Sequence, residues 1–412
     1  MIKFTNEIRN TKEYSELSLV LKSPKNTRPV LVSGLCEGAE LAFALSVCED
    51  CRDRGVLVIM SDEKKANKVA NTLSTHGLKT CTYLYRDMLF RNIASSHEPE
   101  HERLKTLCRL LNADCDVVVT TSDAMLQFTI SPDRLDSGSM TIRYDEEYEI
   151  EDIIEFLEKN KYLRTEMVDG VGQYSVRGGI LDIFAPGSQN PVRLDFFGSS
   201  IDTMGYFDVI SQRTVESCEE LFLSPCREVI QSAEAEAEIE KVIAHGMRYV
   251  KKRLSEELEC VKSHRELYCI DKYISVVYPE KSCLLDYCGG MQVLAFDYPT
   301  VEQRQKAKDV IEIQNITDML QRGEISPKSA EYTYGAPKLE EYIFSSTSLI
   351  TSNFGASFVG KRFSGIYNFE TRQTISYGGK FDLLLEDISN YMRSGYRVKV
   401  VCETSQAASF LA

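Results

Sequence analysis

Residues 34–41 stand where a nucleotide-binding protein carries its phosphate loop. They read GLCEGAEL, follow an apolar run at 29–33 and precede a segment of helical periodicity. A working loop has the sequence GxxxxGK[ST], in which Lys reaches the β- and γ-phosphates and the hydroxyl binds Mg²⁺. Gly34 takes the first glycine position, but Ala39, Glu40 and Leu41 take the other three. The spacing therefore predicts the scaffold of a phosphate loop without its chemistry.

The substitutions act against nucleotide binding in different ways. Glu40 would place a negative charge beside a polyphosphate, and Leu41 offers no oxygen to a metal ion. The apolar run 116–121 ends in Thr120 and Thr121 and is followed by Ser122, not by the acid that would hold Mg²⁺. We therefore expect no catalytic residue and no cofactor in this chain. The alternative, an ATPase, requires nucleotide binding at 34–41.

Cysteine and histidine do not form a metal-binding pattern. Thirteen cysteines are spread along the chain, and the one CxxC, at 48–51, lies in a helical segment without a second pair. His97 and His101 are four residues apart but lack a third ligand nearby, which favours a solvated start of a helix. We expect reduced, mostly buried thiols and no metal site.

Arginine is the only basic residue type in the segment 170–216. Arg177, Arg193 and Arg213 occur there without any lysine. Guanidinium groups suit fixed, bidentate contacts with carboxylates, whereas lysine would supply a mobile point charge. The segment therefore has residues suited to recognising an acidic partner.

The alternation in 192–197 predicts which of its side chains are exposed. Because side chains alternate along a strand, Val192, Leu194 and Phe196 share one face, and Arg193 and Phe197 share the other. If the first set faces the core, an exposed aromatic side chain lies beside an arginine, which is a composition typical of interface hot spots.

A purely structural explanation of these arginines is also open. In it, Arg177 and Arg193 pair with Asp182 and Asp195 across the sheet and contact no partner. Periodicity alone does not decide between this explanation and the hot spot.

The first third of the chain alternates strand and helix patterns. This order predicts a parallel, doubly wound sheet. The expected strands are 29–33, 56–60, 81–85, 116–121 and 140–144, and the expected helices are 40–54, 64–76 and 100–112.

The pattern then changes, which predicts three domains. After an acidic helix at 146–162, short alternating strands with turn signals continue to residue 223. We expect a first α/β domain at 1–145, a small, mostly antiparallel inserted α+β domain at 146–224, and a returning segment at 225–412 that packs against the first domain. The returning segment should hold helices at 233–264, 300–322 and 381–394, and strands at 292–296 and 397–402.

Composition sets further limits. The 412 residues carry 48 Lys and Arg against 62 Asp and Glu, a net charge of −14, which disfavours autonomous tight DNA binding. No apolar run is long enough for a membrane span, and the first ten residues lack a secretory signal, so we expect a cytoplasmic protein. The chain ends about two helical turns into an amphipathic segment, and we expect it to be part of a longer protein.

Several motifs of the inserted segment resemble a known domain. YSVRGGILDIF, PVRLDFFG, IDTMGYFD and SQRTVE are similar to the domain shared by UvrB and the transcription-repair coupling factors, the Mfd family. The tail at 372–404 resembles the end of the UvrB-like module of that family. UvrB keeps an intact phosphate loop and a long DNA-clamping β-hairpin, for which 83–101 is too short. The resemblance is therefore to the coupling factors.

This resemblance implies a fold, a partner and site residues. The fold would be a degenerate, UvrB- or helicase-like phosphate-loop sheet with an inserted domain that docks onto UvrA. The residues implicated in that contact fall on Arg177, Arg193 and Phe197. The complete protein would be an ATP-dependent DNA translocase, which binds RNA polymerase and duplex DNA through domains C-terminal of this chain. The alternative is a UvrB-like or helicase-like ATPase that acts directly on damaged DNA.

Overall fold

The computed structural model describes most of the chain as two compact units, 1–370 and 371–412, which are treated separately below. The described residues are 5–22, 28–93, 96–352, 358, 360–373, 375, 377–400, 406 and 409.

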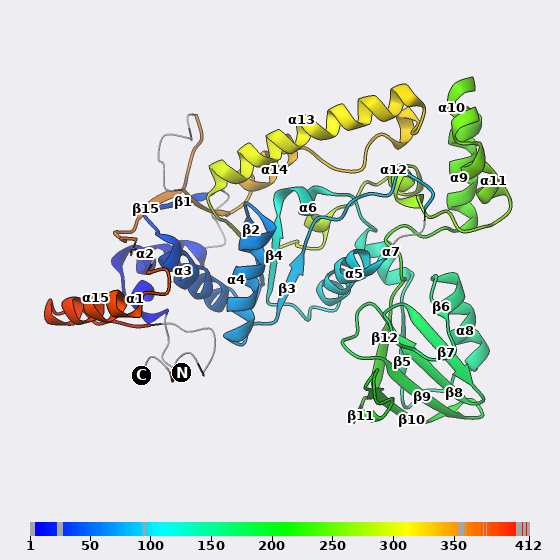
Figure 1. The fold of residues 1–412 in the computed structure, drawn as a ribbon, viewed down its shortest axis with the longest axis horizontal. Coiled ribbons are helices and arrows are strands. Elements are labelled where there is room, and N and C mark those ends of the chain that lie inside the picture. The colour runs from blue at the N-terminus through cyan, green and yellow to red at the C-terminus, as the bar shows by residue number, and fades with distance from the viewer. Residues whose placement is uncertain are drawn as a thin grey trace. The chain divides into compact units, whose positions relative to one another are not determined.

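A parallel sheet of seven strands organises the first unit (Figure 1). Its order is β15-β1-β14-β13-β2-β4-β3, and every neighbouring pair runs parallel. The prediction of a parallel α/β sheet is confirmed. Strands from both sides of the inserted segment contribute: β1 (Val30–Ser33), β2 (Val56–Met60), β3 (Thr80–Tyr83), β4 (Val117–Thr121), β13 (Gln292–Ala295), β14 (Leu349–Thr351) and β15 (Gly365–Asn368).

Both faces of this sheet are covered, which explains its apolar central strands. In β2, Leu57 and Ile59 enter one hydrophobic core, while Val56 and Val58 enter the other. A central strand buried on both faces reads as a continuous apolar run. The helices of this part are α1 (Asn6–Arg9), α2 (Lys12–Leu21), α3 (Glu37–Asp50), α4 (Glu63–Thr75), α5 (Glu98–Leu111), α6 (Ser122–Leu126) and α7 (Pro132–Ser137).

The inserted segment forms a second, mostly antiparallel sheet with the order β11-β10-β9-β8-β7-β6. Only β6 and β7 pair in parallel. Helix α8 (Ile150–Lys159) supplies Ile153 and Leu157 to the core beneath one face of this sheet. The strands are β6 (Leu163–Arg164), β7 (Gln173–Arg177), β8 (Ile180–Phe184), β9 (Val192–Phe197), β10 (Ser200–Phe207) and β11 (Thr214–Ser217).

The strand predicted at 140–144 does not join the parallel sheet. β5 (Met140–Arg143) pairs antiparallel with β12 (Glu220–Leu223) in a separate two-stranded sheet. Ile142 and Leu221 from these strands are buried in the core of the inserted segment. Burial in this core and pairing with β12, about 80 residues later, decide the place of β5, so the prediction from the local apolar pattern was wrong.

The helical stretch predicted at 233–264 is three helices. α9 (Ala233–Ala244), α10 (Arg248–Arg253) and α11 (Ser255–Lys262) are separated because Met247 has an extended backbone, with φ −62° and ψ 156°, and Leu254 leaves helical geometry. The helix predicted at 300–322 is confirmed as α13 (Tyr298–Arg322). Shorter elements complete the unit: η1 (Ile270–Tyr273), α12 (Ile274–Val277), η2 (Leu284–Asp286), η3 (Pro327–Ser329) and α14 (Ala336–Phe344).

The second unit contains helix α15 (Phe381–Arg393), as predicted. Of the strand predicted at 397–402, the described residues 397–400 are not in a strand, and 401–402 lie outside the described residues. Most of the amphipathic segment at the end of the chain lies outside them as well. None of the described helices is long and apolar enough to cross a membrane.

Candidate docking face on the inserted domain

The predicted site residues share the outer face of the inserted sheet. In the strand register, Asp182 of β8 lies opposite both Ser175 of β7 and Arg193 of β9. Arg177 lies two residues beyond Ser175 on β7, so it points to the same face. Two adjacent hairpins therefore bring Arg177 and Arg193 to one acid.

The predicted alternation in β9 is confirmed. Val192 and Leu194 are buried in the core, and Phe196 packs partly against it. On the opposite face, Phe197 is 85% exposed. A phenylalanine this exposed at the end of a strand contributes almost nothing to the core of its own domain.

Asp182 holds both arginines. Its carboxylate is completely buried and accepts a bidentate interaction from Arg193, with Nε–Oδ1 2.6 Å and Nη2–Oδ2 2.8 Å. Arg177 donates from Nη2 to Oδ2 of the same acid at 2.6 Å. The cross-strand pairing considered from the sequence therefore exists at Asp182. Within the described residues, neither arginine forms an ion pair with Asp195.

Arg193 has further contacts that fix its guanidinium. Nη1 donates to the backbone carbonyl of Gln212 at 3.1 Å, and the group lies 4.6 Å from the centre of the Phe207 ring. The hydrogen bond to Asp182 raises the pKa of Arg193 above its ordinary value. Its side chain is 22% exposed, against 48% for Arg177. Arg193 is thus a rigid, mostly covered cation, and Arg177 is an accessible one.

The two glycines after Arg177 allow the hairpins to approach closely. Gly178 has φ +63°, and a Cβ on Gly179 would lie 2.8 Å from the carbonyl oxygen of Phe196. The backbones of β9 and of the β7–β8 turn therefore approach each other too closely at this point for a side chain on residue 179. This approach places the β7–β8 turn directly beside the β9 strand that carries Phe197.

The phosphate-loop position lies between β1 and α3. Gly34 has φ +76°, and a Cβ there would lie 1.9 Å from the carbonyl oxygen of Phe369, the residue after β15. The Phe369 ring is buried and contacts the Phe43 ring of α3 edge-on, at 5.7 Å between centroids. The chain itself therefore fills the space against Gly34.

The other loop positions form the first turns of α3. Ala39 and Leu41 are partly buried against the adjacent core. Glu40 is half-buried, and this burial raises the pKa of its carboxyl, with a smaller opposing effect from Lys65. An acid, not a cation, thus lies where the β- and γ-phosphates would need a positive charge.

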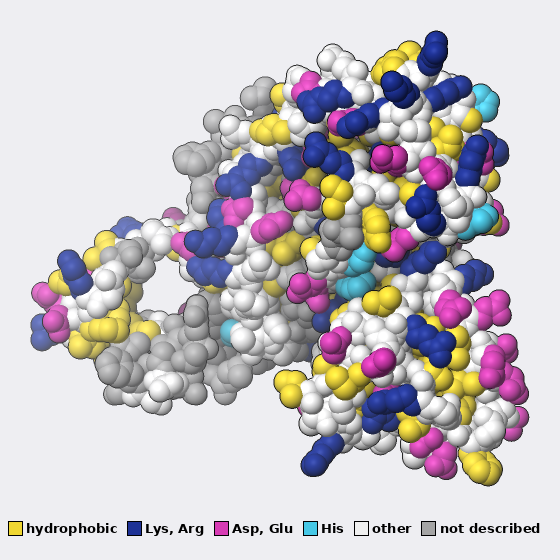
Figure 2. Space-filling model, turned by 45° about the vertical axis from the view of Figure 1, so that its right-hand side comes forward, with side chains coloured by type: hydrophobic (Ala, Val, Ile, Leu, Met, Phe, Trp, Pro, Cys, Tyr) yellow, Lys and Arg dark blue, Asp and Glu magenta, His cyan; other side chains and the backbone are white. Residues whose placement is uncertain are grey.

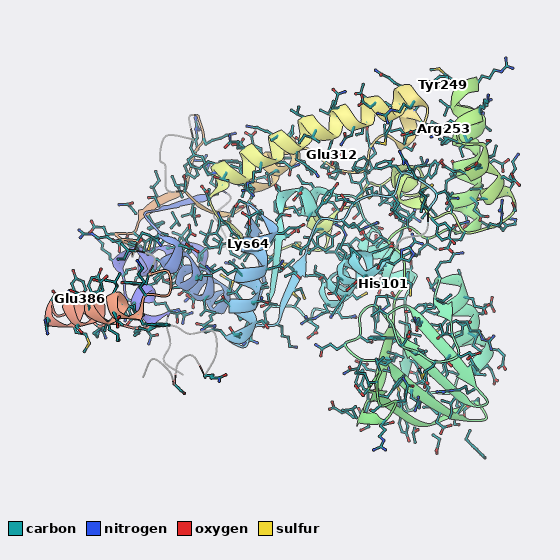
Figure 3. All side chains as sticks on the ribbon, in the orientation of Figure 1. Lys64, His101, Tyr249, Arg253, Glu312 and Glu386 are labelled. Atoms are coloured by element: carbon teal, nitrogen blue, oxygen red, sulfur yellow. The ribbon has the colours of Figure 1, made fainter. Side chains whose placement is uncertain are left out.

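The sequence suggested a solvated helix start at the two histidines, but His97, which precedes α5, and His101, in its first turn, are both partly buried. His97 contacts Glu100, with Nδ1–Oε2 3.3 Å. His101 lies close to the inserted domain, since a Cβ on Gly172 would be 3.1 Å from its ring (Figure 3). Burial lowers the pKa of His101 to about 4. Among the described residues no cluster could hold a metal ion, and every described cysteine is a free thiol.

A buried ionic cluster, which sequence analysis missed, lies where the chain leaves the inserted domain and returns to the α/β part of the first unit. Arg103 donates to Glu228 at 2.8 Å, and Arg227 donates to Glu100 at 2.9 Å. Although burial acts in the opposite direction, Arg86 and Arg227 hold the pKa of Glu100 well below its ordinary value. The charges balance, with three arginines against three acids: Arg86, Arg103, Arg227, Glu100, Glu228 and Asp271.

A model of a known protein family matches the inserted domain. Residues 140–228 match the family model of the UvrB interaction domain. This range contains β5 to β12 and every candidate docking residue.

Full-length relatives extend the similarity to almost the whole chain. The transcription-repair-coupling factor of Bacillus subtilis is 26% identical over 72% of this chain and 26% of the relative. Those of Staphylococcus aureus (strain bovine RF122 / ET3-1) and Staphylococcus haemolyticus are each 22% identical, over 98% and 96% of this chain and 35% of each relative. The chain thus spans about a third or less of the relatives it matches. It is homologous to transcription-repair-coupling factors over nearly its whole length and carries a UvrB interaction domain.

Proposed function

We propose that this chain is the adaptor module of a transcription-repair-coupling factor and that it recruits UvrA. In the bacterial cytoplasm it would link RNA polymerase stalled at DNA lesions to nucleotide excision repair. Binding of RNA polymerase and ATP-driven translocation on duplex DNA would belong to domains C-terminal of this chain. The homology and the match at 140–228 support a role in repair.

The observation that carries the docking proposal is the exposure of Phe197 beside an accessible arginine. Phe197 is 85% exposed, and the side chain of Arg177 is 48% exposed on the same face. Aromatic and arginine side chains dominate the binding energy of protein interfaces. Pairing with Asp182 explains why the arginines are ordered, but it does not explain an exposed phenylalanine. A docking face accounts for both.

The face is suited to a partner with carboxylates around an apolar pocket. Arg177 uses one nitrogen on Asp182 and keeps other N–H groups directed to solvent, where a carboxylate of UvrA could accept from them. Arg193 uses three of its five N–H groups on Asp182 and Gln212 and is less exposed than Arg177, so it would mainly add positive charge and hold the shape of the face. Phe197 would enter the apolar pocket.

We also propose that the module is not itself an ATPase. Phe369 occupies the space against Gly34, and Glu40 would repel the phosphates. The remaining positions, Ala39 and Leu41, have no polar side-chain atoms for a phosphate or for Mg²⁺.

Calorimetric titration of this chain with purified UvrA tests the proposal. We expect saturable 1:1 binding that Arg177→Ala and Phe197→Ala each weaken, while both variants keep the unfolding temperature of the unmodified chain. If the unmodified chain does not bind UvrA, or if both variants bind as it does, the proposal is wrong.

A further inference from the structure

Helix α10 concentrates positive charge on a chain whose net charge is −14. Its six residues, RYVKKR, include four cations, and only Val250 among them is buried. α10 lies against the C-terminal end of α13, where a Cβ on Gly323 would be 2.9 Å from the ring of Tyr249 (Figure 1). Figure 3 shows Tyr249 and Arg253 together on this short helix.

Cations from two distant parts of the chain meet α10. Arg91, which follows β3, and Arg322, in the last turn of α13, line a groove of about 540 Å³ together with Lys252, Arg253 and Tyr249. Lys and Arg side chains gather on the upper part of the molecule in Figure 2, where Figure 1 draws α10 and the end of α13. We call this set the basic surface: Arg91, Arg248, Lys251, Lys252, Arg253 and Arg322.

The acids of the groove neutralise only part of this charge. Glu257 is buried and already binds Lys272, with Nζ–Oε1 2.8 Å. Glu324 pairs with Arg253 at 3.5 Å. Arg322, in turn, pairs with Asp318 of its own helix at 3.8 Å.

Four cations therefore face solvent without a matching acid. Within the described residues, the side chains of Arg91, Arg248, Lys251 and Lys252 form no ion pair, and all four residues are exposed. Glu256 is the one acid lining the groove that has no ion pair with a described residue. Such a cluster repels itself, and an external polyanion would relieve that repulsion.

We propose that the basic surface binds the phosphate backbone of duplex DNA without reading its sequence. Lysine and arginine on an exposed helix supply the contacts of sequence-independent binding, in which counterions are released. Two aromatic side chains line the groove, of which Phe90 packs against the core and Tyr249 is 48% exposed. Binding of single strands relies on successive aromatic platforms, so the surface favours a duplex.

The net charge sets the strength of this interaction. The few unpaired cations act against repulsion between DNA and the rest of this acidic chain, and counterion release makes each phosphate contact weaker as the salt concentration rises. We therefore expect weak binding that is measurable at low salt and lost near physiological salt. This agrees with the absence of autonomous tight DNA binding expected from composition.

Fluorescence anisotropy of a labelled 20-base-pair duplex, measured between 20 and 200 mM salt, tests the proposal. The test variant is Arg248→Gln/Lys251→Gln/Lys252→Gln. The control variant, Lys12→Gln/Lys306→Gln/Lys338→Gln, removes three exposed lysines that each pair with an acid elsewhere on the surface. Both variants change the net charge equally.

The test variant should bind at least about tenfold more weakly at the lowest salt, and its salt slope should fall by about 2 to 3, since each lost phosphate contact removes about 0.9. The control variant should retain affinity and slope. Arg91 lies outside α10, so Arg91→Gln leaves this helix unchanged. It should also weaken binding, and this result would hold even if the test variant misfolded.

Three results would overturn the proposal. The unmodified chain could fail to bind at 20 mM salt, or the test and control variants could bind equally. Finally, a single strand of equal charge, or polyglutamate, could bind as tightly as the duplex. The basic surface would then not be specific for duplex DNA.

Discussion

Arg193 and Asp182 form a bidentate ion pair in which the acid is wholly buried and the arginine is 22% exposed. The same carboxylate also accepts from Arg177, so one acid orders two cations on the outer face of the inserted sheet. Pairing with Asp182 within the sheet is therefore compatible with a docking role for the same arginines. Asp182 holds the guanidinium groups in place, which lowers the entropy lost when a partner binds.

Replacing Asp182 by Asn should destabilise the inserted domain by about 1–3 kcal/mol, because charged hydrogen bonds to two arginines are lost. This loss of stability should be smaller than that caused by breaking a fully buried ion pair, because the side chain of Arg177 can turn to water. Thermal unfolding measures it. Asp195→Asn, on the same face, should change stability by less than about 0.5 kcal/mol, because within the described residues Asp195 pairs with neither arginine. Equal effects of the two substitutions would contradict this account.

ATP with Mg²⁺ should produce no heat of binding in calorimetry and no hydrolysis. The double substitution Glu40→Lys/Leu41→Thr should not restore either activity, because Ala39 still takes the second glycine position and no acid for Mg²⁺ ends the apolar run 116–121. Micromolar affinity of the unmodified chain for ATP would support the ATPase alternative.

Glu228→Ala should destabilise the first unit strongly, by about 3–5 kcal/mol, since it leaves Arg86 and Arg103 buried without their shared acid. Denaturant unfolding measures the loss. Glu302→Ala, which removes an acid paired with Lys306 on the surface of α13, is the control and should cost less than about 1 kcal/mol. A small effect of Glu228→Ala would mean that the buried cluster does not support the fold.

Stability should fall as the pH is lowered from about 6.5 to about 4. His101 has a pKa of about 4 in the folded protein, below its ordinary 6.5, so the unfolded chain binds the proton first in this interval. Its buried neighbour Glu100 remains charged there, because Arg86 and Arg227 lower the pKa of that carboxyl although burial acts in the opposite direction. The expected loss of unfolding free energy is about 3 kcal/mol, from a difference of about 2.5 between the folded and unfolded pKa values.

His101→Gln should flatten this part of the profile of unfolding free energy against pH. His245→Gln, which replaces an exposed histidine of α9's C-terminal end, should leave it unchanged. The assignment to His101 would be wrong if both variants kept the slope of the unmodified chain.

The periodicity of the sequence predicted those features that depend only on which side chains of a single strand or helix are buried. The alternation of Val192, Leu194 and Phe197 in β9 follows from one strand facing one core. Periodicity could not predict the partner of β5, because β12 lies about 80 residues later. Nor could it predict the contact of Arg86 with Glu228, 142 residues apart, or the approach of Arg91 and Arg322 to α10. Shared partners such as Asp182 become visible only once the register of three strands is known.

The central claim, that the outer face of the inserted sheet recruits UvrA, is tested most directly by comparing two highly exposed apolar residues. Phe197 is 85% exposed on the proposed face, and Ile210 is 93% exposed in the turn after β10. In calorimetric titrations with UvrA, Phe197→Ser should weaken binding by about 10- to 100-fold, the range of an interface anchor. Ile210→Ser should bind like the unmodified chain. Equal affinities of the two variants, with both domains folded, would contradict the account.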